Sequence, residues 1–317
     1  MKNRTRRGSE ISQGRDVPES SWGVALIGPG RVGQAMAQLL ARAGVRIRFV
    51  AARRLSRARQ AARFIGSGKV VRLDDPALAG AKIFLITVKD SAIAPVAGEL
   101  AGIIPNWRGR IALHTCGSAS ASLLTPLARK GASIGSVHPY QTVPSREAGI
   151  KNLPGGYWAV DGDARARRLA GRWVKLLKGT SFSIPANRRT LYHLSAFLVS
   201  PTTVTLIDQS EKLLRIAGVP KRVIRPMLTR FVGETLENFA QFGALKSLTG
   251  PAIRGDWTTL EKHAAALKRT APQLLPLYHE LVVAMLRVAG KRSRALDSGR
   301  AGRGVDRKAN FIGKFKP

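Results

Sequence analysis

The sequence predicts an α/β protein in which a doubly wound, mostly parallel sheet is followed by an all-helical C-terminal domain. Three observations carry this prediction. A glycine-rich stretch near the start of the chain has the order strand, tight turn, helix; short apolar runs then alternate with helical patterns up to residue 186; and the strand period disappears from residue 187 onwards. Alternating strands and helices build parallel sheets with right-handed crossovers. We therefore expect two folded domains, residues 22–186 and 187–290.

The first strand–turn–helix unit has the pattern of a dinucleotide-binding fingerprint. An apolar run, Val24 to Ile27, leads into Gly28-Pro29-Gly30-Arg31-Val32-Gly33, and a helical pattern follows until Gly44. In such a unit the first glycine permits the turn, the second lets the backbone approach a pyrophosphate, and the third lets the helix pack closely on the strand. The pyrophosphate then lies on the free N–H groups at the positive end of the helix. The motif predicts a Rossmann-like domain with residues 28–33 at a bound dinucleotide.

The second strand–helix unit indicates which dinucleotide this is. A strand-like run over residues 46–52 ends in Arg53-Arg54, and Ser56 follows. NAD-selective sites place a carboxylate here for the ribose 2′-hydroxyl, whereas arginine accommodates the 2′-phosphate of NADP. Because cations and a hydroxyl stand where the carboxylate would be, we predict NADP, with Arg53, Arg54 and Ser56 at its adenosine end. The three arginines between residues 57 and 63 are interpreted as a solvated helix face.

Later strands are predicted to deliver polar side chains to the carboxyl edge of the sheet. Apolar runs predict strands at residues 69–73, 82–88, 110–114, 133–137, 157–160 and 181–184, with a helix over 164–177 between the last two. One run ends at Val88-Lys89, the next at His114, and the one after immediately before His138. Ligands of open α/β sheets lie beyond the carboxyl ends of the strands. Val88 and Lys89 are therefore assigned to the cofactor site and both histidines to the crevice beside it.

From residue 187 the pattern is helical. Helical patterns cover residues 188–214, 222–242, 256–268 and 272–289, and Gly290 ends the last of them. The segment between the second and third patterns, residues 249–256, contains the helix-breaking pair Gly250-Pro251 and a helix-capping Asp256. Arg254 projects from it, and arginine suits bidentate capture of a carboxylate. Arg254 and Thr249 are predicted to contact the substrate; an Arg254–Asp256 clamp without a ligand is the equal alternative.

The chain is strongly basic, with a formal net charge of +34. The segment 291–317 holds nine Lys or Arg against two Asp, and neither it nor the segment 1–21 has a sustained apolar period. We interpret both as a disordered basic tail and head. Such a charge attracts polyanions at low salt. Without interleaved aromatic residues or a nucleic-acid motif, we expect no specific nucleic-acid partner.

The composition also points to a compartment. The single cysteine, Cys116, excludes an internal disulfide and suits a reducing cytoplasm, and we interpret it as a packing residue. No apolar run approaches the roughly 20 residues of a membrane helix, so no membrane is expected. No group of His, Cys, Asp and Glu has metal-ligand spacing, so no metal is expected.

Several of these pieces together resemble a family of Rossmann-like oxidoreductases that carry a C-terminal helical domain of unknown function (DUF2520). The resemblance covers residues 22–290 and rests on the glycine motif and on Thr87-Val88-Lys89-Asp90-Ser91-Ala92-Ile93, His114-Thr115-Cys116-Gly117, His138-Pro139, Tyr192-His193 and Leu248-Thr249-Gly250-Pro251-Ala252-Ile253-Arg254-Gly255-Asp256. The family is similar in layout to pyrroline-5-carboxylate reductase, ketopantoate reductase and prephenate dehydrogenase. The resemblance implies a homodimer formed through helices. It also implies that His138 contacts the substrate, as the His-Pro histidine of prephenate dehydrogenases does.

Three histidines are candidates for the proton transfer that reduction of a carbonyl or imine requires. His138 ranks first, and His114 and His193 follow; for each one alone, a structural hydrogen-bonding role is the alternative. The predicted function is that of an NADP-dependent oxidoreductase that transfers a hydride to or from a small, carboxylate-bearing substrate. The helical domain is expected to close the substrate site.

Two other functions remain open at this stage. Lys89 stands where the family usually has Pro, and Ser200-Pro201 stands where it tends to have Ser-Asn. Both departures favour a non-catalytic NADP-binding sensor or regulatory protein. The basic composition favours a nucleic-acid-associated protein, whose binding would weaken steeply with salt.

Overall fold

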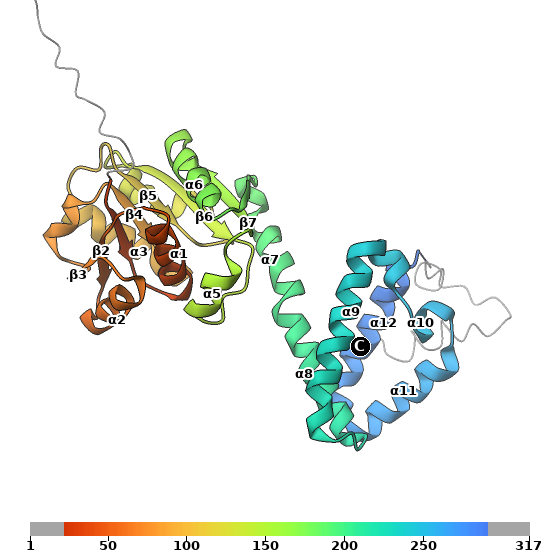
Figure 1. The fold of residues 1–317 in the computed structure, drawn as a ribbon. Helices are drawn as coiled ribbons and strands as arrows, with labels where there is room; N and C mark the ends of the chain where they lie inside the picture. The colour runs from red at the N-terminus through yellow and green to blue at the C-terminus, as the bar shows by residue number, and fades with distance from the viewer. Residues whose placement is uncertain (1–21, 291–317) are drawn as a thin grey trace, which may run out of the picture. The chain divides into compact units, whose positions relative to one another are not determined.

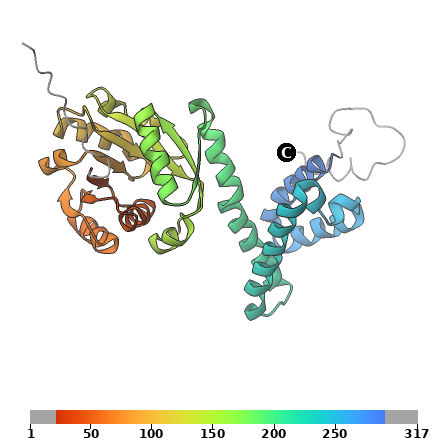
Figure 2. The same cartoon turned by 45° about the horizontal axis from the view of Figure 1, so that its top comes forward.

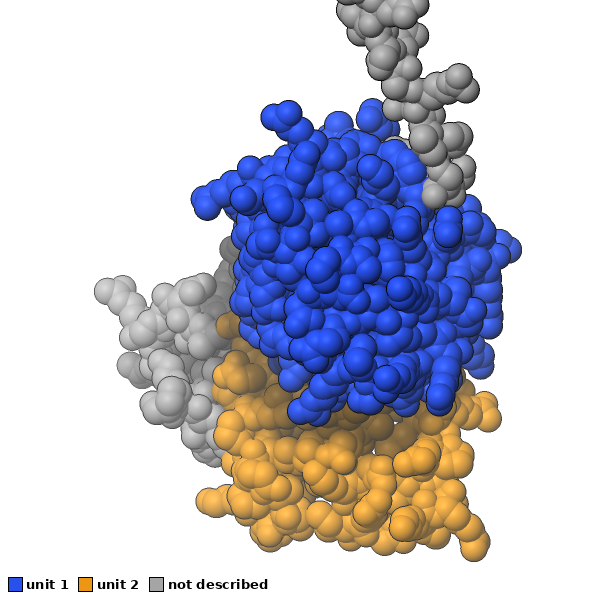
Figure 3. All heavy atoms as spheres, turned by 90° about the vertical axis from the view of Figure 1, so that its left-hand side faces the viewer, with its two compact units in different colours: residues 1–202 blue, residues 203–317 orange. Residues whose placement is uncertain are grey.

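The structure is a computed structural model that describes residues 22–290. The head and tail that the sequence predicts to be disordered lie outside the described residues. The chain forms two compact units, residues 1–202 and 203–317 (Figures 1 and 3). The first unit therefore includes the helix that follows the sheet, whereas the sequence placed the division near residue 186.

The first unit is built on one eight-stranded sheet. Its strands are β1 (Val24–Ile27), β2 (Ile47–Ala52), β3 (Lys69–Arg72), β4 (Ile83–Ile86), β5 (Ile111–His114), β6 (Ser133–Pro139), β7 (Tyr157–Gly162) and β8 (Thr180–Phe182). Their spatial order is β3-β2-β1-β4-β5-β6-β7-β8. Strands β1 to β6 are parallel to their neighbours, and β7 is antiparallel to β6. The predicted doubly wound, mostly parallel sheet is confirmed.

Helices cover both faces of this sheet (Figure 2). The helices and short 3₁₀ turns of the first unit are α1 (Arg31–Arg42), α2 (Leu55–Ile65), η2 (Pro76–Gly80), α3 (Asp90–Ile103), η3 (Ala121–Leu124), α4 (Thr125–Ala128), α5 (Arg146–Asn152), α6 (Ala164–Leu176), η4 (Ala186–Arg188) and α7 (Arg189–Val199). One core lies between the sheet and α1, α2 and α6, and a second between the sheet and α3, η3 and α4. All four residues of β1, β4 and β5 are buried, as expected of strands covered on both faces.

The helical region continues with α8 (Pro201–Ile216), α9 (Lys221–Ser247), α10 (Pro251–Arg254), α11 (Trp257–Thr270), η5 (Pro272–Leu274) and α12 (Leu275–Val288). The pattern predicted as one helix over 188–214 is divided at Ser200, because Pro201 lacks an N–H and begins a new helix. A kink at Gly243 (φ 71°, ψ 176°) interrupts α9. The predicted helical C-terminal domain is confirmed. Its core cluster lies between α10, α11 and α12 and is centred on Leu260, Val282 and Leu286.

Much of the apolar surface on the long helices is exposed. The exposed large apolar residues of α8 and α9 are Val204, Leu206, Ile216, Val223, Met227, Phe231, Leu236, Phe239, Phe242 and Leu245. The helical stretch Ala186–Ile216, 31 residues long, reaches a mean hydropathy of 1.2, and its apolar window is unburied. It is therefore long and apolar enough to cross a membrane by length and composition, a feature that the sequence analysis did not identify. Within this stretch, however, Arg189 is fully buried against the sheet.

Candidate functional site

The glycine turn between β1 and α1 is fixed by the end of β4. Gly28 has a φ of +67°, and a Cβ at this position would lie 2.1 Å from a methyl group of Val88. The Thr87 hydroxyl donates to the Gly28 carbonyl at 2.8 Å. A Cβ on Gly33 would lie 2.0 Å from the Thr87 Oγ1, so that α1 can approach β4 only with glycine there. Two of the three glycines thus shape the turn itself.

The amino end of α1 is open to a ligand. Gly30 is the N-cap residue and offers no side chain to the free N–H groups, and the first turn holds no acidic residue. Gly30 is exposed, and a Cβ there would meet the Thr87 carbonyl oxygen at 3.1 Å, a close but not prohibitive distance. An uncapped helix amino terminus with this exposure binds anions such as a pyrophosphate.

A cleft of about 800 Å³ surrounds this turn, within the range of small-molecule sites. The predicted cofactor residues that line it are Gly28, Pro29, Gly30, Arg31, Val32, Arg53, Arg54, Val88 and Lys89. Gly33 lies beneath the turn instead, and Ser56 is exposed on the first turn of α2 but does not line the cleft. Thr115, from the segment after β5, lies on the lining as well.

Three arginines stand at the β2 end of the cleft. Arg53 and Arg54 follow the last residue of β2, and Arg57 comes from the first turn of α2. All three are exposed, and Arg53 forms an ion pair of 2.5 Å with Glu99 of α3. The sequence analysis interpreted Arg57 as part of a solvated helix face. The structure places it on the cleft, because α2 begins directly after Arg54 and its first turn faces the same space.

The carboxyl end of β6 presents His138 to a second cavity. Its Nδ1 lies 2.8 Å from the Tyr192 hydroxyl of α7, and the two rings meet edge to face. The Tyr192 ring also contacts Tyr140 and Phe182, at centroid distances of 5.3 and 6.0 Å. His193 is exposed, 6.3 Å from His138 between ring centroids. The structure thus brings two of the predicted histidines together, and Tyr192 of α7 bonds His138 of β6.

Both His138 and His193 line this cavity, which has a volume of about 350 Å³. Pro201, the residue that departs from the family pattern, lines it too. The cavity adjoins the cofactor cleft along one loop, since Thr142 lines the cavity and the next residue, Val143, lines the cleft. A ligand that occupies the cavity would therefore lie beside the cleft.

The electrostatics of the second cavity favour uncharged groups. Burial lowers the pKa of His138 to about 3, and His193, Arg189 and His114 act in the same direction. Burial raises the pKa of Tyr192 to about 12, against the opposing effect of the Arg189 charge. At neutral pH His138 is therefore a neutral imidazole and Tyr192 a neutral phenol.

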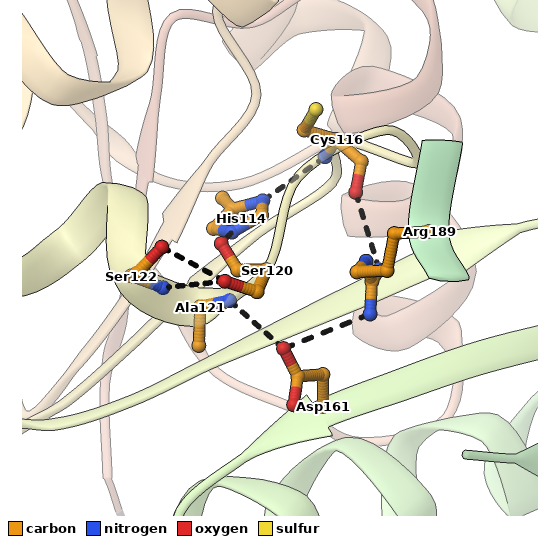
Figure 4. Close-up of polar contacts among 7 residues, drawn as sticks. All are labelled: His114, Cys116, Ser120, Ala121, Ser122, Asp161 and Arg189. Atoms are coloured by element: carbon orange, nitrogen blue, oxygen red, sulfur yellow. Dashed lines mark hydrogen bonds and ion pairs between the residues drawn. The ribbon is translucent and has the colours of Figure 1, made fainter. Parts of the chain in front are cut away.

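His114 occupies a different kind of place (Figure 4). It is fully buried, its Nδ1 accepts the N–H of Cys116 at 3.1 Å, and its Nε2 lies 3.0 Å from the Ser120 carbonyl oxygen. The first bond leaves the proton on Nε2, which then donates to Ser120. Burial lowers the pKa of His114 to about 4. Both ring nitrogens therefore serve the loop between β5 and η3, and this geometry supports a structural role for His114.

Arg189, the first residue of α7, is a buried cation that the sequence analysis missed (Figure 4). Its side chain is fully buried, 3.7 Å from the Asp161 carboxylate of β7, and it donates to the Cys116 carbonyl at 3.4 Å. Asp161 in turn accepts the N–H of Ala121 at 2.9 Å. This network joins α7, β7 and the β5–η3 loop. In the sequence, Arg189 is one cation in a basic run, and nothing local marks it as buried.

The remaining residues that the sequence analysis singled out are Cys116 and those of the loop over residues 249–256. Cys116 is buried, and burial raises the pKa of its thiol, in keeping with a packing residue. Arg254 and Thr249 are exposed in the second unit. Asp256 caps α11 by accepting from Thr259, as predicted for this loop. A substrate contact by Arg254 and Thr249 stays a prediction.

Several solved structures share the fold of this chain. A candidate NADP oxidoreductase, BF3122 from Bacteroides fragilis, is 22% identical with a TM-score of 0.69; the match covers 86% of this chain and 99% of that one. The imine reductase of Aspergillus terreus in complex with NADPH4 and dibenz[c,e]azepine is 18% identical with a TM-score of 0.57, covering 93% and 99%. A pyrroline-5-carboxylate reductase from Coxiella burnetii is 14% identical with a TM-score of 0.53, covering 85% and 98%. At these identities the likeness concerns the fold.

The two parts of the chain also match sequence families. Residues 8–139 match a Rossmann-like domain, and residues 156–285 match a domain of unknown function, DUF2520. No curated protein matches the chain. The two matches together confirm the resemblance stated from the sequence.

Proposed function

We propose that this protein is an NADP-dependent oxidoreductase that acts on a small, carboxylate-bearing substrate. One observation carries the proposal: the glycine turn, the uncapped amino end of α1 and three arginines line a single cleft, and the cavity of His138 adjoins it at Thr142 and Val143. The fold it shares with an NADP oxidoreductase candidate and an NADPH4-bound imine reductase supports this function.

The residues of the cleft fit the parts of NADP. The open N–H groups of α1 and the exposed Gly30 suit the pyrophosphate. Arg53, Arg54 and Arg57 suit the 2′-phosphate, because guanidinium groups bind phosphate oxygens in pairs. Bound there, the cofactor would supply or accept a hydride. Val88, half-buried at the turn, would limit the depth at which the dinucleotide lies.

On the substrate side, His138 would hold a proton for the oxygen or nitrogen of the reacting bond, because it lines the second cavity and its hydrogen bond to Tyr192 engages only Nδ1. Arg254 and Thr249 are proposed to hold the substrate carboxylate. A panel of cyclic imines, imino acids and 2-keto acids, with NADPH absorbance as the readout, tests the substrate class. Replacing His138 by Asn should lower turnover by about 10² to 10⁴, while NADPH binding is retained.

The cofactor assignment is tested by titration. NADPH should bind more tightly than NADH, and Arg53→Asp should narrow or reverse the difference, because it removes a phosphate partner and adds a negative charge. Repeating the titration at low and high salt separates this site from a general polyanion surface, whose affinity falls steeply with salt. Equal affinities for NADPH and NADH in the unmodified protein would contradict the NADP assignment.

We also propose a cytoplasmic homodimer in which the exposed side chains of α8 and α9 are covered by a second copy. Val223, Met227 and Phe231 follow one another at four-residue spacing and are all exposed, so that they form a stripe along one side of α9. A contiguous exposed apolar surface of this kind marks an interaction site. The cytoplasmic assignment rests on the single cysteine.

A further inference from the structure

The imidazole of His138 is fixed on two sides by other elements. Its Nδ1 lies 2.8 Å from the Tyr192 hydroxyl. One face of its ring lies against Gly117, where a Cβ would come within 2.6 Å of Nε2, 2.7 Å of Cε1 and 2.9 Å of Cδ2. The ring therefore sits where a side chain at residue 117 would otherwise be, with Nδ1 towards α7.

The chemistry of the two groups sets the direction of their hydrogen bond. A phenol has one proton to donate, and an unprotonated imidazole nitrogen is a strong acceptor. If Nδ1 carried the proton, the Tyr192 hydroxyl would accept it and its own proton would need another acceptor. Within residues 22–290, Nδ1 of His138 is the hydrogen-bond partner of this hydroxyl. Both groups are satisfied by this one bond when Tyr192 donates to Nδ1 and the imidazole proton lies on Nε2.

We propose that Tyr192 is a positioning residue that keeps His138 as a neutral imidazole with its proton on Nε2, so that His138 presents an N–H donor to the substrate. This inference rests on the proposed function, in which His138 contacts the substrate. The hydrogen bond of His138 among the described residues engages Nδ1, and the ring lines the second cavity, so we assign Nε2 to the ligand.

The surroundings make this arrangement necessary for proton transfer near neutral pH. Because burial and neighbouring cationic groups hold the pKa of His138 at about 3, the imidazolium is not available as a donor. A substrate oxygen or nitrogen that gains an electron pair instead takes the proton of Nε2 while Nδ1 takes the proton of Tyr192. Water then protonates Nε2 while Nδ1 returns its proton to Tyr192. His138 ends as it began, neutral, and one proton has moved from solvent to substrate.

The test is the tautomer of His138, read from ring-nitrogen NMR of the full-length protein labelled with ¹⁵N-histidine. The chain has five histidines, and a His138→Asn variant identifies the signals of His138. His114 is an internal reference, since its Nδ1 accepts the Cys116 N–H and its Nε2 carries the proton whatever Tyr192 does. In the unmodified protein at neutral pH, His138 should show a protonated Nε2 and a hydrogen-bonded, unprotonated Nδ1.

The matched variants are Tyr192→Phe and Tyr140→Phe. The first removes the donor and should leave His138 in a mixture of tautomers. The pKa of its imidazole should change as well. The second removes a neighbouring hydroxyl that bonds Ser195 rather than His138, and it should leave the tautomer unchanged. A protonated Nδ1 in the unmodified protein overturns the inference even if Tyr192→Phe does not fold, as does an unchanged His138 in Tyr192→Phe. Failure of NADPH to bind would overturn the proposed function alone.

Discussion

The two compact units bury their apolar side chains to very different degrees. Every residue of β1, β4 and β5 is buried, and the sheet carries a core on each face. In contrast, α8 buries no residue and α9 buries one, Ile224. The sheet has thus covered its apolar faces within one chain. The long helices α8 and α9 have not, and their exposed side chains are the surface that we propose a second copy covers.

The difference in burial separates the part of the chain that holds a fixed backbone shape from the part that exposes an apolar surface. Positions at which the backbone must hold a fixed shape, such as Gly28 and Gly33, lie in the unit that is packed on both faces. Precise turns need rigid supports, and the buried strands on either side provide them. The exposed side chains of α9 lie on a helix whose shape needs no such support, so that its surface is available for association.

The largest expected effect concerns the glycine turn. Gly30→Val should leave the protein folded, because its Cβ meets only the Thr87 carbonyl oxygen at 3.1 Å, but its branched side chain should fill the cleft. We expect NADPH affinity to fall by about 10³ or more, since the pyrophosphate loses its approach to the backbone. Gly171→Val, on α6 with no atom within 4 Å of the new Cβ, is the control. Unchanged NADPH affinity in Gly30→Val would place the cofactor elsewhere.

The next largest effect concerns the helices. Replacing Phe231 and Phe239 together by Glu should raise the dimer dissociation constant by about 10² to 10⁴, because each phenylalanine that the second copy buries contributes about 1.5–3 kcal/mol. Sedimentation at several concentrations measures this, and Tyr157→Glu, an exposed aromatic of the sheet unit, is the control. NADPH affinity should not change. A chain that is monomeric at every concentration before mutation would contradict the proposed dimer.

The features that the sequence predicted correctly are those that a local sequence pattern determines. The strand–glycine–helix unit, the alternation of strands and helices and the purely helical C-terminal part all follow from periodicity and turn chemistry. The structure also places Arg53 and Arg54 on the cleft, because both follow directly from the end of β2; their contact with a cofactor stays a prediction. Such features depend on residues that are neighbours in the chain.

Features that depend on distant residues were missed. Arg189 and Asp161 are 28 positions apart, and only the sheet and α7 bring them to 3.7 Å. A sequence does not distinguish one histidine from another, yet backbone groups engage both ring nitrogens of His114, whereas His138 bonds a tyrosine side chain and lines a cavity. The unburied helical stretch across α7 and α8 was also missed, because polar residues interrupt it and it contains no long uninterrupted apolar run.

The smallest of the three effects is a loss of stability in acid that begins in the sheet unit. His114 binds a proton near pH 6.5 when unfolded but only near pH 4 when folded. Between these values the unfolded chain holds more protons, so the free energy of unfolding falls as the pH falls, by about 2–3 kcal/mol from this residue. His138, whose pKa is also lowered, acts in the same direction. Urea unfolding at several pH values measures the loss. His114→Asn should lower stability at neutral pH, because it weakens the bonds to Ser120 and Cys116, and should flatten the pH dependence. A His114→Asn curve as steep as that of the unmodified protein would show that the acid loss arises from groups other than His114.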